Sequence, residues 1–401
     1  MTASPPTKKY LLAERTIDDA DIADLIAWLQ TNPWLTQGTL VKQFEAEWAN
    51  WLGRRYSLFV NSGSSANMLM YYAAMLAGRL DNKKVIVPAI SWATTVAPAI
   101  QLGLEPIMCE ADWQTFGLDL EHLDRLCQEH QPGAVIVVHT LGVPGQMDGL
   151  LALKKKYGFL LMEDACPATG STFGGQHVGT FGDMASFSFY FGHHLSTIEG
   201  GMVSTDDEEL QDILLHIRSH GWAKDVDPAK EALEAAQRNV LEFNRTFTFY
   251  YPGFNFRSTD LNARIGLSQM RKADWVVQRR VQNQQVYERR FAGASDYHVP
   301  SNPGGVTCSI SFVALASSTE HRDRIGQTLA AEGIETRPLG GGSMGRQPFW
   351  SDRHGARSYP VADAIHERSF MLPNNPDLSV ADIETICDVV LAVPASMKKA
   401  A

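Results

Sequence analysis

Two turns that follow apolar segments carry residue types that could bind a charged cofactor. Asn61-Ser-Gly-Ser-Ser-Ala-Asn67 follows the apolar segment 56–60 and opens an expected helix, so backbone N–H groups and hydroxyls at Gly63 and Ser64 could bind a phosphate. Asp164 follows the apolar segment 159–162, where a carboxylate could keep a ring nitrogen protonated. The simpler alternatives are a serine-capped turn and a carboxylate that caps a helix.

A histidine pair, His193-His194, lies in the segment between Ser188 and Gly201. Imidazole has an unperturbed pKa of about 6.5, so either ring could take and return a proton near neutral pH. Ser188 lies five residues before His193, and its hydroxyl could reach the phosphate expected at Gly63. For an isolated histidine, a hydrogen-bonded structural imidazole is the more frequent explanation.

Four further residues could complete a binding site. Trp92 follows an expected strand and could stack on a cofactor ring, although core packing is the usual role of such an aromatic residue. Asn255, in a Gly-Phe-Asn loop, could donate its amide to a phosphate. His220 and Arg337 lie near turns and could contact a substrate, with plain surface positions as the alternative.

Alternating strands and helices must position these residues. Apolar strands alternate with amphipathic helices up to residue 163, which predicts an α/β fold with a mostly parallel mixed sheet covered on both faces. After residue 201 we expect a polar stretch over 225–245, a long helix from about 260 to 290, and a smaller C-terminal α+β domain that includes a strand near 334–337. The predicted domains are residues 1–275 and 276–401.

Composition excludes several classes of partner. The 401 residues carry a formal net charge of −10, which disfavours a nucleic-acid partner and an acidic membrane surface. No apolar run reaches the roughly 20 residues needed to span a bilayer, so we expect a cytoplasmic chain. No two cysteines have metal-binding spacing. A metal site built from His177, His193 and His194 lacks supporting carboxylates, and no metal is expected.

Taken together, these motifs resemble the DegT/DnrJ/EryC1/StrS sugar aminotransferase family, whose members are fold-type I, aspartate aminotransferase-like enzymes that use pyridoxal 5'-phosphate (PLP). The resemblance runs from about residue 36 to the C-terminus. Ser62-Gly63-Ser64-Ser65 matches the family's phosphate-binding turn, and Asp164 matches the partner of the pyridine nitrogen. Gly253-Phe254-Asn255 matches the loop that reaches the cofactor phosphate of the neighbouring subunit, which implies a homodimer with shared active sites.

The lysine that binds the cofactor covalently in this family is replaced by a histidine. In the family, a Ser-Phe segment precedes the lysine by five residues and a Glu follows it by six. Counting forward from Ser188 and back from Glu199 leads to His193 both times, which leaves His194 as the second candidate. This substitution, with the segment His220-Gly-Trp222, resembles a subgroup of nucleotide-sugar 3-dehydratases whose substrate is like GDP-4-keto-6-deoxymannose.

The resemblance implies a specific chemistry. PLP, or its amine form pyridoxamine 5'-phosphate (PMP), would be held without a covalent bond, and L-glutamate would supply the amine. His193 would act as the catalytic base and acid in removing the C3 hydroxyl of a nucleotide-linked 4-keto-6-deoxy sugar. Such deoxysugars are made for O-antigen and lipopolysaccharide. A related dehydratase carries an iron–sulfur cluster on cysteines between the histidine loop and the Asn255 loop; this chain has no cysteine between Gly201 and Gly253, so no cluster is expected.

Two other functions are compatible with the motifs. One is a nucleotide-sugar aminotransferase of the same family that uses histidine as its proton shuttle. The other is a catalytically inactive relative with a cofactor-binding or regulatory role, which the intact Asp164 and Ser188 disfavour. The sequence also departs from the family at Pro167, where a Gln or Glu usually lies near the phenolic oxygen of the cofactor, and this departure bears on the substrate.

Overall fold

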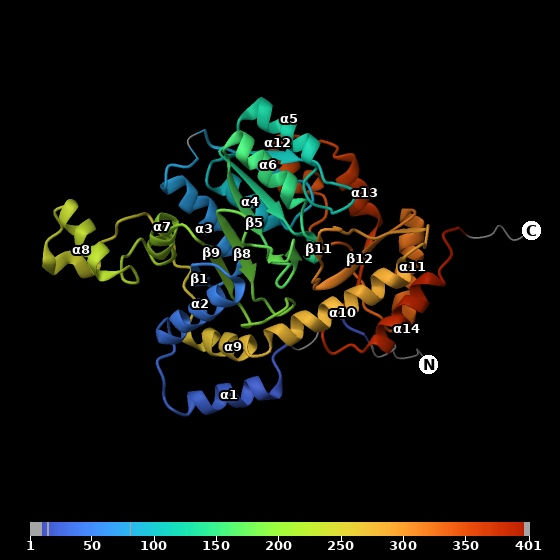
Figure 1. Ribbon diagram of the computed structural model, residues 1–401, viewed down its shortest axis with the longest axis horizontal. Helices are drawn as coiled ribbons and strands as arrows, with labels where there is room; N and C mark the ends of the chain where they lie inside the picture. Colours follow the sequence, from blue (N-terminus) through green and yellow to red (C-terminus); the bar gives the residue numbers. More distant parts are fainter. Residues whose placement is uncertain (1–9, 14–15, 81, 397–401) are drawn as a thin grey trace, which may run out of the picture.

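A mixed sheet of seven strands forms the centre of the molecule (Figure 1). The computed structural model describes residues 10–13, 16–80 and 82–396. The strands lie in the order β1-β9-β8-β5-β4-β2-β3, and only β9 runs against the others. The predicted α/β class with a mostly parallel mixed sheet is confirmed. The strand bounds are Tyr56–Val60 (β1), Lys84–Pro88 (β2), Glu105–Cys109 (β3), Ala134–Val138 (β4), Leu160–Asp164 (β5), Met184–Ser188 (β8) and Gly201–Thr205 (β9).

Helices cover both faces of this sheet, because alternate residues of its strands are buried against different layers. In β2, Val85 and Val87 belong to one buried cluster, and Ile86 belongs to another. One face packs against α3 (Gly63–Leu76), α4 (Ala93–Gln101) and α7 (Glu208–Arg218); the other face packs against α2 (Thr39–Leu52), α5 (Leu120–His130), α6 (Met147–Tyr157) and α9 (Asp260–Met270).

A smaller three-stranded sheet lies beyond helix α10 (Ala273–Phe291) (Figure 1). This helix contains residues 275 and 276, where the domain boundary is predicted. The chain shows no break there, and the boundary remains a prediction. The small sheet has its own buried cluster. Its elements and neighbours are β10 (Tyr297–His298), β12 (Ser311–Ala316), β13 (Ser369–Pro373), α11 (Thr319–Ala331), α13 (Pro360–Arg368) and α14 (Val380–Leu391). Helix α12 (Pro348–His354) instead places Trp350 in a buried cluster of the large sheet.

Three sequence-based expectations differ from the structure. The long helix expected from 260 to 290 is divided into α9 and α10, because the chain leaves helical hydrogen bonding at residues 271 and 272. The strand expected near 334–337 makes only single bridges, Tyr10 to Ile334 and Arg337 to Met371. The polar stretch 225–245 contains a capped helix, α8 (Pro228–Gln237), which begins after Asp227 accepts hydrogen bonds from two backbone N–H groups.

The segment around α8 projects from the body of the molecule (Figure 1), and it exposes large apolar side chains. A 3-10 helix, Glu242–Phe247, follows α8. Phe243 is 95% exposed, and four more large apolar side chains nearby are exposed: Leu233, Leu241, Phe247 and Phe249. A group of exposed apolar side chains of this kind is typical of a surface that contacts another protein.

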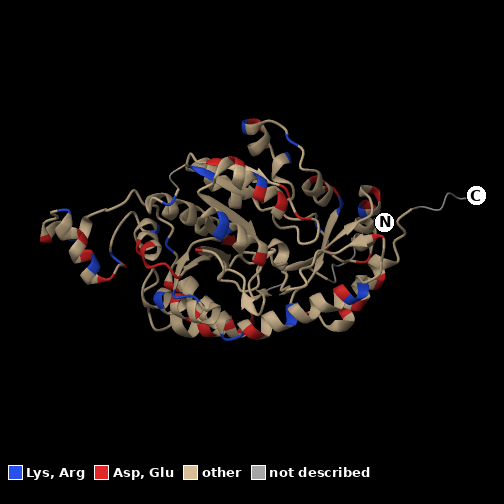
Figure 2. Cartoon of the chain, turned by 45° about the horizontal axis from the view of Figure 1, so that its top comes forward, with Lys and Arg blue, Asp and Glu red and all other residues tan. Residues whose placement is uncertain are grey.

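Charged side chains of both signs are interspersed along the outer helices, while the sheet carries few of them (Figure 2). Among the described residues, no helix is long and apolar enough to cross a membrane. The five cysteines are all free thiols.

Candidate active site

Residues that follow β1 and β8 meet at the carboxyl edge of the sheet. Ser62 caps α3 by accepting a hydrogen bond from the Ser65 N–H. A Cβ atom added to Gly63 would lie 2.8 Å from the Cβ of Ser188, so only glycine allows the start of α3 to approach the end of β8 this closely. Gly201 faces the same turn, since a Cβ there would lie 2.3 Å from the carbonyl carbon of Ser62. The N-terminal end of α3 and the Ser188 hydroxyl therefore border one space.

A second helix begins beside this turn. The Ser64 hydroxyl lies 2.8 Å from the hydroxyl of Thr94, in the first turn of α4. Trp92 is the residue that precedes α4, and its side chain is 60% exposed. The structure thus places the predicted Trp92 next to the predicted phosphate-binding turn, with an indole that the single chain leaves open to solvent.

The Asp164 carboxylate is buried and is held from three sides. Its Oδ2 atom accepts hydrogen bonds from Asn67 Nδ2 at 2.9 Å and from Thr95 Oγ1 at 2.7 Å, and its Oδ1 atom accepts one from the Cys166 N–H at 3.1 Å. The Asn67 amide is itself oriented, because its oxygen accepts a hydrogen bond from the Ser186 hydroxyl at 2.6 Å. These hydrogen bonds fix the orientation of the Asp164 carboxylate.

His193 lies close to Asp164 through the backbone of Cys166. Its Nδ1 atom is 2.9 Å from the Cys166 carbonyl oxygen. Because a carbonyl only accepts, Nδ1 carries the hydrogen, and Nε2 of the neutral ring keeps its lone pair. Burial lowers the pKa of His193 to about 4, against opposing effects of the Cys166 carbonyl and the Asp164 charge. This value lies below the unperturbed value of about 6.5, so the environment of His193 favours the neutral ring.

His194 points elsewhere. Its Nε2 atom lies 2.9 Å from the Cys308 carbonyl oxygen, and the ring is 1% exposed. The second ring nitrogen of His194 is buried without a hydrogen-bond partner. Burial and the positive charge of Arg280 lower its pKa well below the usual value. His194 thus faces the segment that precedes β12, whereas His193 faces the residues that follow β5.

The predicted His220 and Asn255 lie together, joined through Arg257. The Asn255 oxygen accepts a hydrogen bond from Arg257 Nε at 3.1 Å, and Arg257 Nη2 lies 3.4 Å from His220 Nε2. The Asn255 side chain is exposed in the single chain. Arg337 makes a separate contact, an ion pair with Glu335 in which the charged atoms lie 2.7 Å apart.

The residues that orient Asp164 lie inside helices and are not assigned to it from the sequence. Asn67 ends the motif that predicts a phosphate-binding turn, and Thr95 belongs to no motif. Arg280 is buried in α10 and donates to the Ile310 carbonyl at 3.0 Å. Among the described residues, no group of three or more His, Cys, Asp or Glu side chains could hold a metal ion.

The arrangement fits the cofactor that the motifs imply. Gly63 leaves space where a Cβ would collide with Ser188, and the backbone N–H groups of a 14-residue helix, α3, begin there. Helix N-termini of this kind bind phosphate. Asp164 offers a fixed carboxylate for a ring nitrogen, and His193 offers a free Nε2 atom on the same edge of the sheet.

Comparisons with known proteins give a consistent result. The family described as "DegT/DnrJ/EryC1/StrS aminotransferase family" matches residues 16–391. Two relatives, from Yersinia pseudotuberculosis and Escherichia coli O55:H7, are 32% and 33% identical over 334 residues, covering 82% of this chain and 84% and 85% of theirs. Both are named GDP-4-keto-6-deoxy-D-mannose 3-dehydratase. A crystal structure of GDP-4-keto-6-deoxymannose-3-dehydratase with a trapped PLP-glutamate geminal diamine is similar with a TM-score of 0.87 and 29% identity, covering 95% of this chain and all of that one.

Proposed function

Because this chain belongs to the DegT/DnrJ/EryC1/StrS aminotransferase family, we propose that it is a PLP- and PMP-dependent nucleotide-sugar 3-dehydratase. It removes the C3 hydroxyl of a 4-keto-6-deoxy sugar like the one carried by GDP-4-keto-6-deoxymannose. L-Glutamate supplies the amine, in keeping with the glutamate adduct in the similar crystal structure. The single observation that carries the proposal is that His193, and no lysine, occupies the position beside Asp164 and Ser188.

The proposed cofactor-binding residues would contact different groups of the cofactor. Gly63, Ser64 and Ser188 would bind the phosphate, and the Asp164 carboxylate would bind the pyridine nitrogen. Trp92 would stack on the ring. When bound, the cofactor would supply an aromatic ring and an imine that stabilise negative charge released at C4' and pass electrons toward C3 of the sugar.

His193 moves the proton. Its Nε2 atom would take a proton from the C4' carbon of the bound cofactor, while Nδ1–H keeps its hydrogen bond to the Cys166 carbonyl. The imidazolium would return this proton to the C3 hydroxyl of the sugar, which would leave as water. Because burial lowers the pKa of His193 to about 4, the protonated ring would be a stronger acid than an ordinary imidazolium. Without a lysine amine to displace the product, water releases ammonia and leaves a 3-deoxy-4-keto sugar.

The substrate can be tested directly. Purified chain, cofactor and glutamate are incubated in turn with GDP-, CDP-, dTDP- and UDP-linked 4-keto-6-deoxy sugars, and the products are analysed by mass spectrometry. We expect a product that has lost one oxygen atom, with the GDP-linked substrate as the best. A stable aminosugar would instead identify a nucleotide-sugar aminotransferase, and no product from any substrate would favour an inactive, cofactor-binding relative.

We also propose a homodimer in which each subunit contributes to the other's site. The exposed Asn255, with Arg257 beside it, donates to the cofactor phosphate of the partner subunit. The exposed apolar side chains around α8, such as Phe243, contribute to the subunit contact. His220 and Arg337 are proposed substrate contacts.

Mixing two inactive variants tests the shared site. We expect Asn255→Ala and His193→Asn each to be nearly inactive, and a co-refolded mixture to regain activity, because each heterodimer has one site that carries neither change. Asn255→Ala with His193→Asn in the same chain, mixed with unmodified chain, is the matched control. No recovery in the mixture of single variants would contradict a shared site.

The proposed location is the cytoplasm, in a pathway that supplies deoxysugars to O-antigen or lipopolysaccharide.

A further inference from the structure

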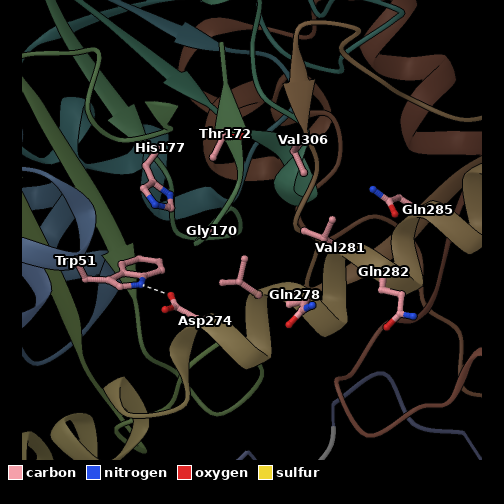
Figure 3. Close-up of a pocket in the computed structure, with 11 residues that line it drawn as sticks. Trp51, Gly170, Thr172, His177, Asp274, Gln278, Val281, Gln282, Gln285 and Val306 are labelled. Atoms are coloured by element: carbon pink, nitrogen blue, oxygen red, sulfur yellow. Dashed lines mark hydrogen bonds between the residues drawn. The ribbon is translucent and has the colours of Figure 1, made fainter. Parts of the chain in front are cut away.

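A cavity of about 500 Å³ lies between α10 and the hairpin of β6 (Thr172–Phe173) and β7 (Gln176–His177) (Figure 3). This volume is within the range of about 300–1,000 Å³ that small-molecule sites occupy. None of the predicted catalytic or cofactor-binding residues is among the eleven residues that line it. The cavity is therefore separate from the site described above.

One wall of the cavity is a fixed aromatic surface. The indole of Trp51 donates from Nε1 to Asp274 Oδ1 at 2.8 Å. Its ring lies 4.9 Å from the imidazole of His177, at an angle of 38°. The Nδ1 atom of His177 is buried without a hydrogen-bond partner. The wall is thus an aromatic pair, Trp51 and His177, held in place by the hydrogen bond to Asp274.

The opposite wall is one face of α10. Gln278, Gln282 and Gln285 lie at helical spacing along α10, and Figure 3 shows Gln282 extending below the helix. The Gln282 Oε1 atom already accepts a hydrogen bond from Arg279, so this amide has its N–H groups to offer, whereas the amides of Gln278 and Gln285 can donate and accept. Val277 and Val281 lie beside them, so this wall also alternates apolar and polar groups.

The floor is held in place by hydrogen bonds. A Cβ atom on Gly170 would lie 2.4 Å from Val277, so α10 packs directly on this turn. The next residue, Ser171, donates to the Gly142 carbonyl at 2.7 Å and accepts from the Cys308 N–H at 2.9 Å. These contacts fix the cavity before any ligand arrives, which lowers the entropic cost of binding.

The charged residues in the cavity lining limit which ligands the cavity can bind. None of the eleven lining residues is Lys or Arg, and Asp274 contributes a negative charge. Arg279 donates to the Gln282 Oε1 atom at 2.7 Å but does not itself line the cavity, whereas the Asp274 carboxylate does and would repel a phosphate group. A neutral ligand with an apolar ring face and several hydroxyl groups matches this lining. Its ring face can pack on Trp51, and its hydroxyls can bond to the three amides and the carboxylate.

We propose that this cavity binds a neutral monosaccharide ring. The apolar face of the sugar packs on Trp51, and its hydroxyls bond to Gln278, Gln282 and Asp274. A 6-deoxy sugar suits the cavity best, because its methyl group can contact Val277 and Val281. The proposal concerns a second site, and it does not depend on the reaction proposed above.

Saturation-transfer NMR tests this second site. The full chain is loaded with PLP and saturated with GDP to occupy the nucleotide-sugar site, and methyl glycosides of fucose and mannose are added as probes. We expect saturation transfer to both probes, stronger for the 6-deoxy sugar. The double variant Gln278→Ala/Gln282→Ala should weaken binding about tenfold, since each lost hydrogen bond contributes about 0.5–1.5 kcal/mol. Both glutamines are exposed on a helix, so alanine leaves the fold intact.

The matched control is Gln128→Ala, an exposed glutamine on α5 that does not line the cavity. It should leave the NMR signal unchanged, and thermal unfolding should be the same for all three proteins. Mannose 1-phosphate should bind more weakly than the methyl glycosides. The proposal is overturned by an absence of transfer in the presence of GDP, by unchanged binding in the double variant, or by tighter binding of the sugar phosphate.

Discussion

The Nδ1 atom of His193 lies 2.9 Å from the carbonyl oxygen of Cys166, two residues after the buried Asp164. This contact fixes the tautomer of the imidazole, since the carbonyl can only accept. It leaves Nε2 free on the same edge of the sheet as the start of α3. His194, the next residue, is instead bonded to the Cys308 carbonyl.

Replacing each histidine separately should distinguish their roles. His193→Asn removes the proposed base and should lower kcat by about 10²–10⁴, the usual contribution of a positioned acid or base. His194→Gln can keep the hydrogen bond to Cys308 and should retain most of the activity. Steady-state kinetics and thermal unfolding should be measured for both variants. Equal losses of kcat in two folded variants would contradict the assignment to His193.

Borohydride reduction tests whether the cofactor is held without a covalent bond. The unmodified chain incubated with PLP should show no increase in mass after reduction, because His193 cannot form the bond that lysine forms. His193→Lys should gain the mass of the reduced cofactor and should dehydrate the sugar more slowly. Intact-protein mass spectrometry checks both results. A stable adduct on the unmodified chain would contradict the account.

Thr95 should act as a positioning residue through Asp164. Thr95→Val keeps the shape of the side chain but removes the 2.7 Å hydrogen bond to the Asp164 carboxylate. Hydrogen bonds to charged groups contribute about 1.5–3 kcal/mol, so cofactor affinity should fall by at least about tenfold. Thr95→Ser keeps the hydroxyl and should restore most of the affinity. Cofactor titration monitored by absorbance measures the effect, and equal affinity of the valine and serine variants would refute it.

The pH dependence of the cofactor-free chain follows from the partly buried imidazole of His193. Burial lowers the pKa of His193 to about 4, below the value of about 6.5 expected in the unfolded chain. Between these two pH values the unfolded chain therefore binds more protons than the folded chain. As a result, His193 makes its whole contribution to the free energy of unfolding above about pH 6.5, and this contribution is lost as the pH falls toward 4. NMR of labelled histidine, compared with His193→Asn, should give a midpoint near 4; a midpoint at or above 6.5 would exclude the proposed environment.

Local sequence patterns predict the elements of the large sheet but not the contacts within the site. Strand and helix alternation predicts β1 to β5 closely, because each strand is an apolar run ended by a turn. The reversed β9 could not be predicted, since its residues are as apolar as those of its parallel neighbours. The division between α9 and α10 carries no Gly or Pro signal.

Within the site, sequence motifs identify residues at strand ends, and tertiary contacts determine the rest. The Gly63 turn and Ser188 are predictable because each follows a strand of the same sheet. Asn67 and Thr95 meet Asp164 only after three elements pack together, so no spacing in the sequence indicates them. The lowered pKa of His193 likewise depends on its burial, which a sequence pattern does not give.

The central claim is that His193 directs the reaction toward loss of a hydroxyl and away from transfer of an amine. The most direct measurement is the amount of ammonia and of sugar product formed from GDP-4-keto-6-deoxymannose with PLP and glutamate, using an enzymatic ammonia assay and NMR of the sugar. The account predicts one ammonia for each sugar that has lost its C3 hydroxyl. An aminosugar that retains this hydroxyl, formed without ammonia, would contradict it.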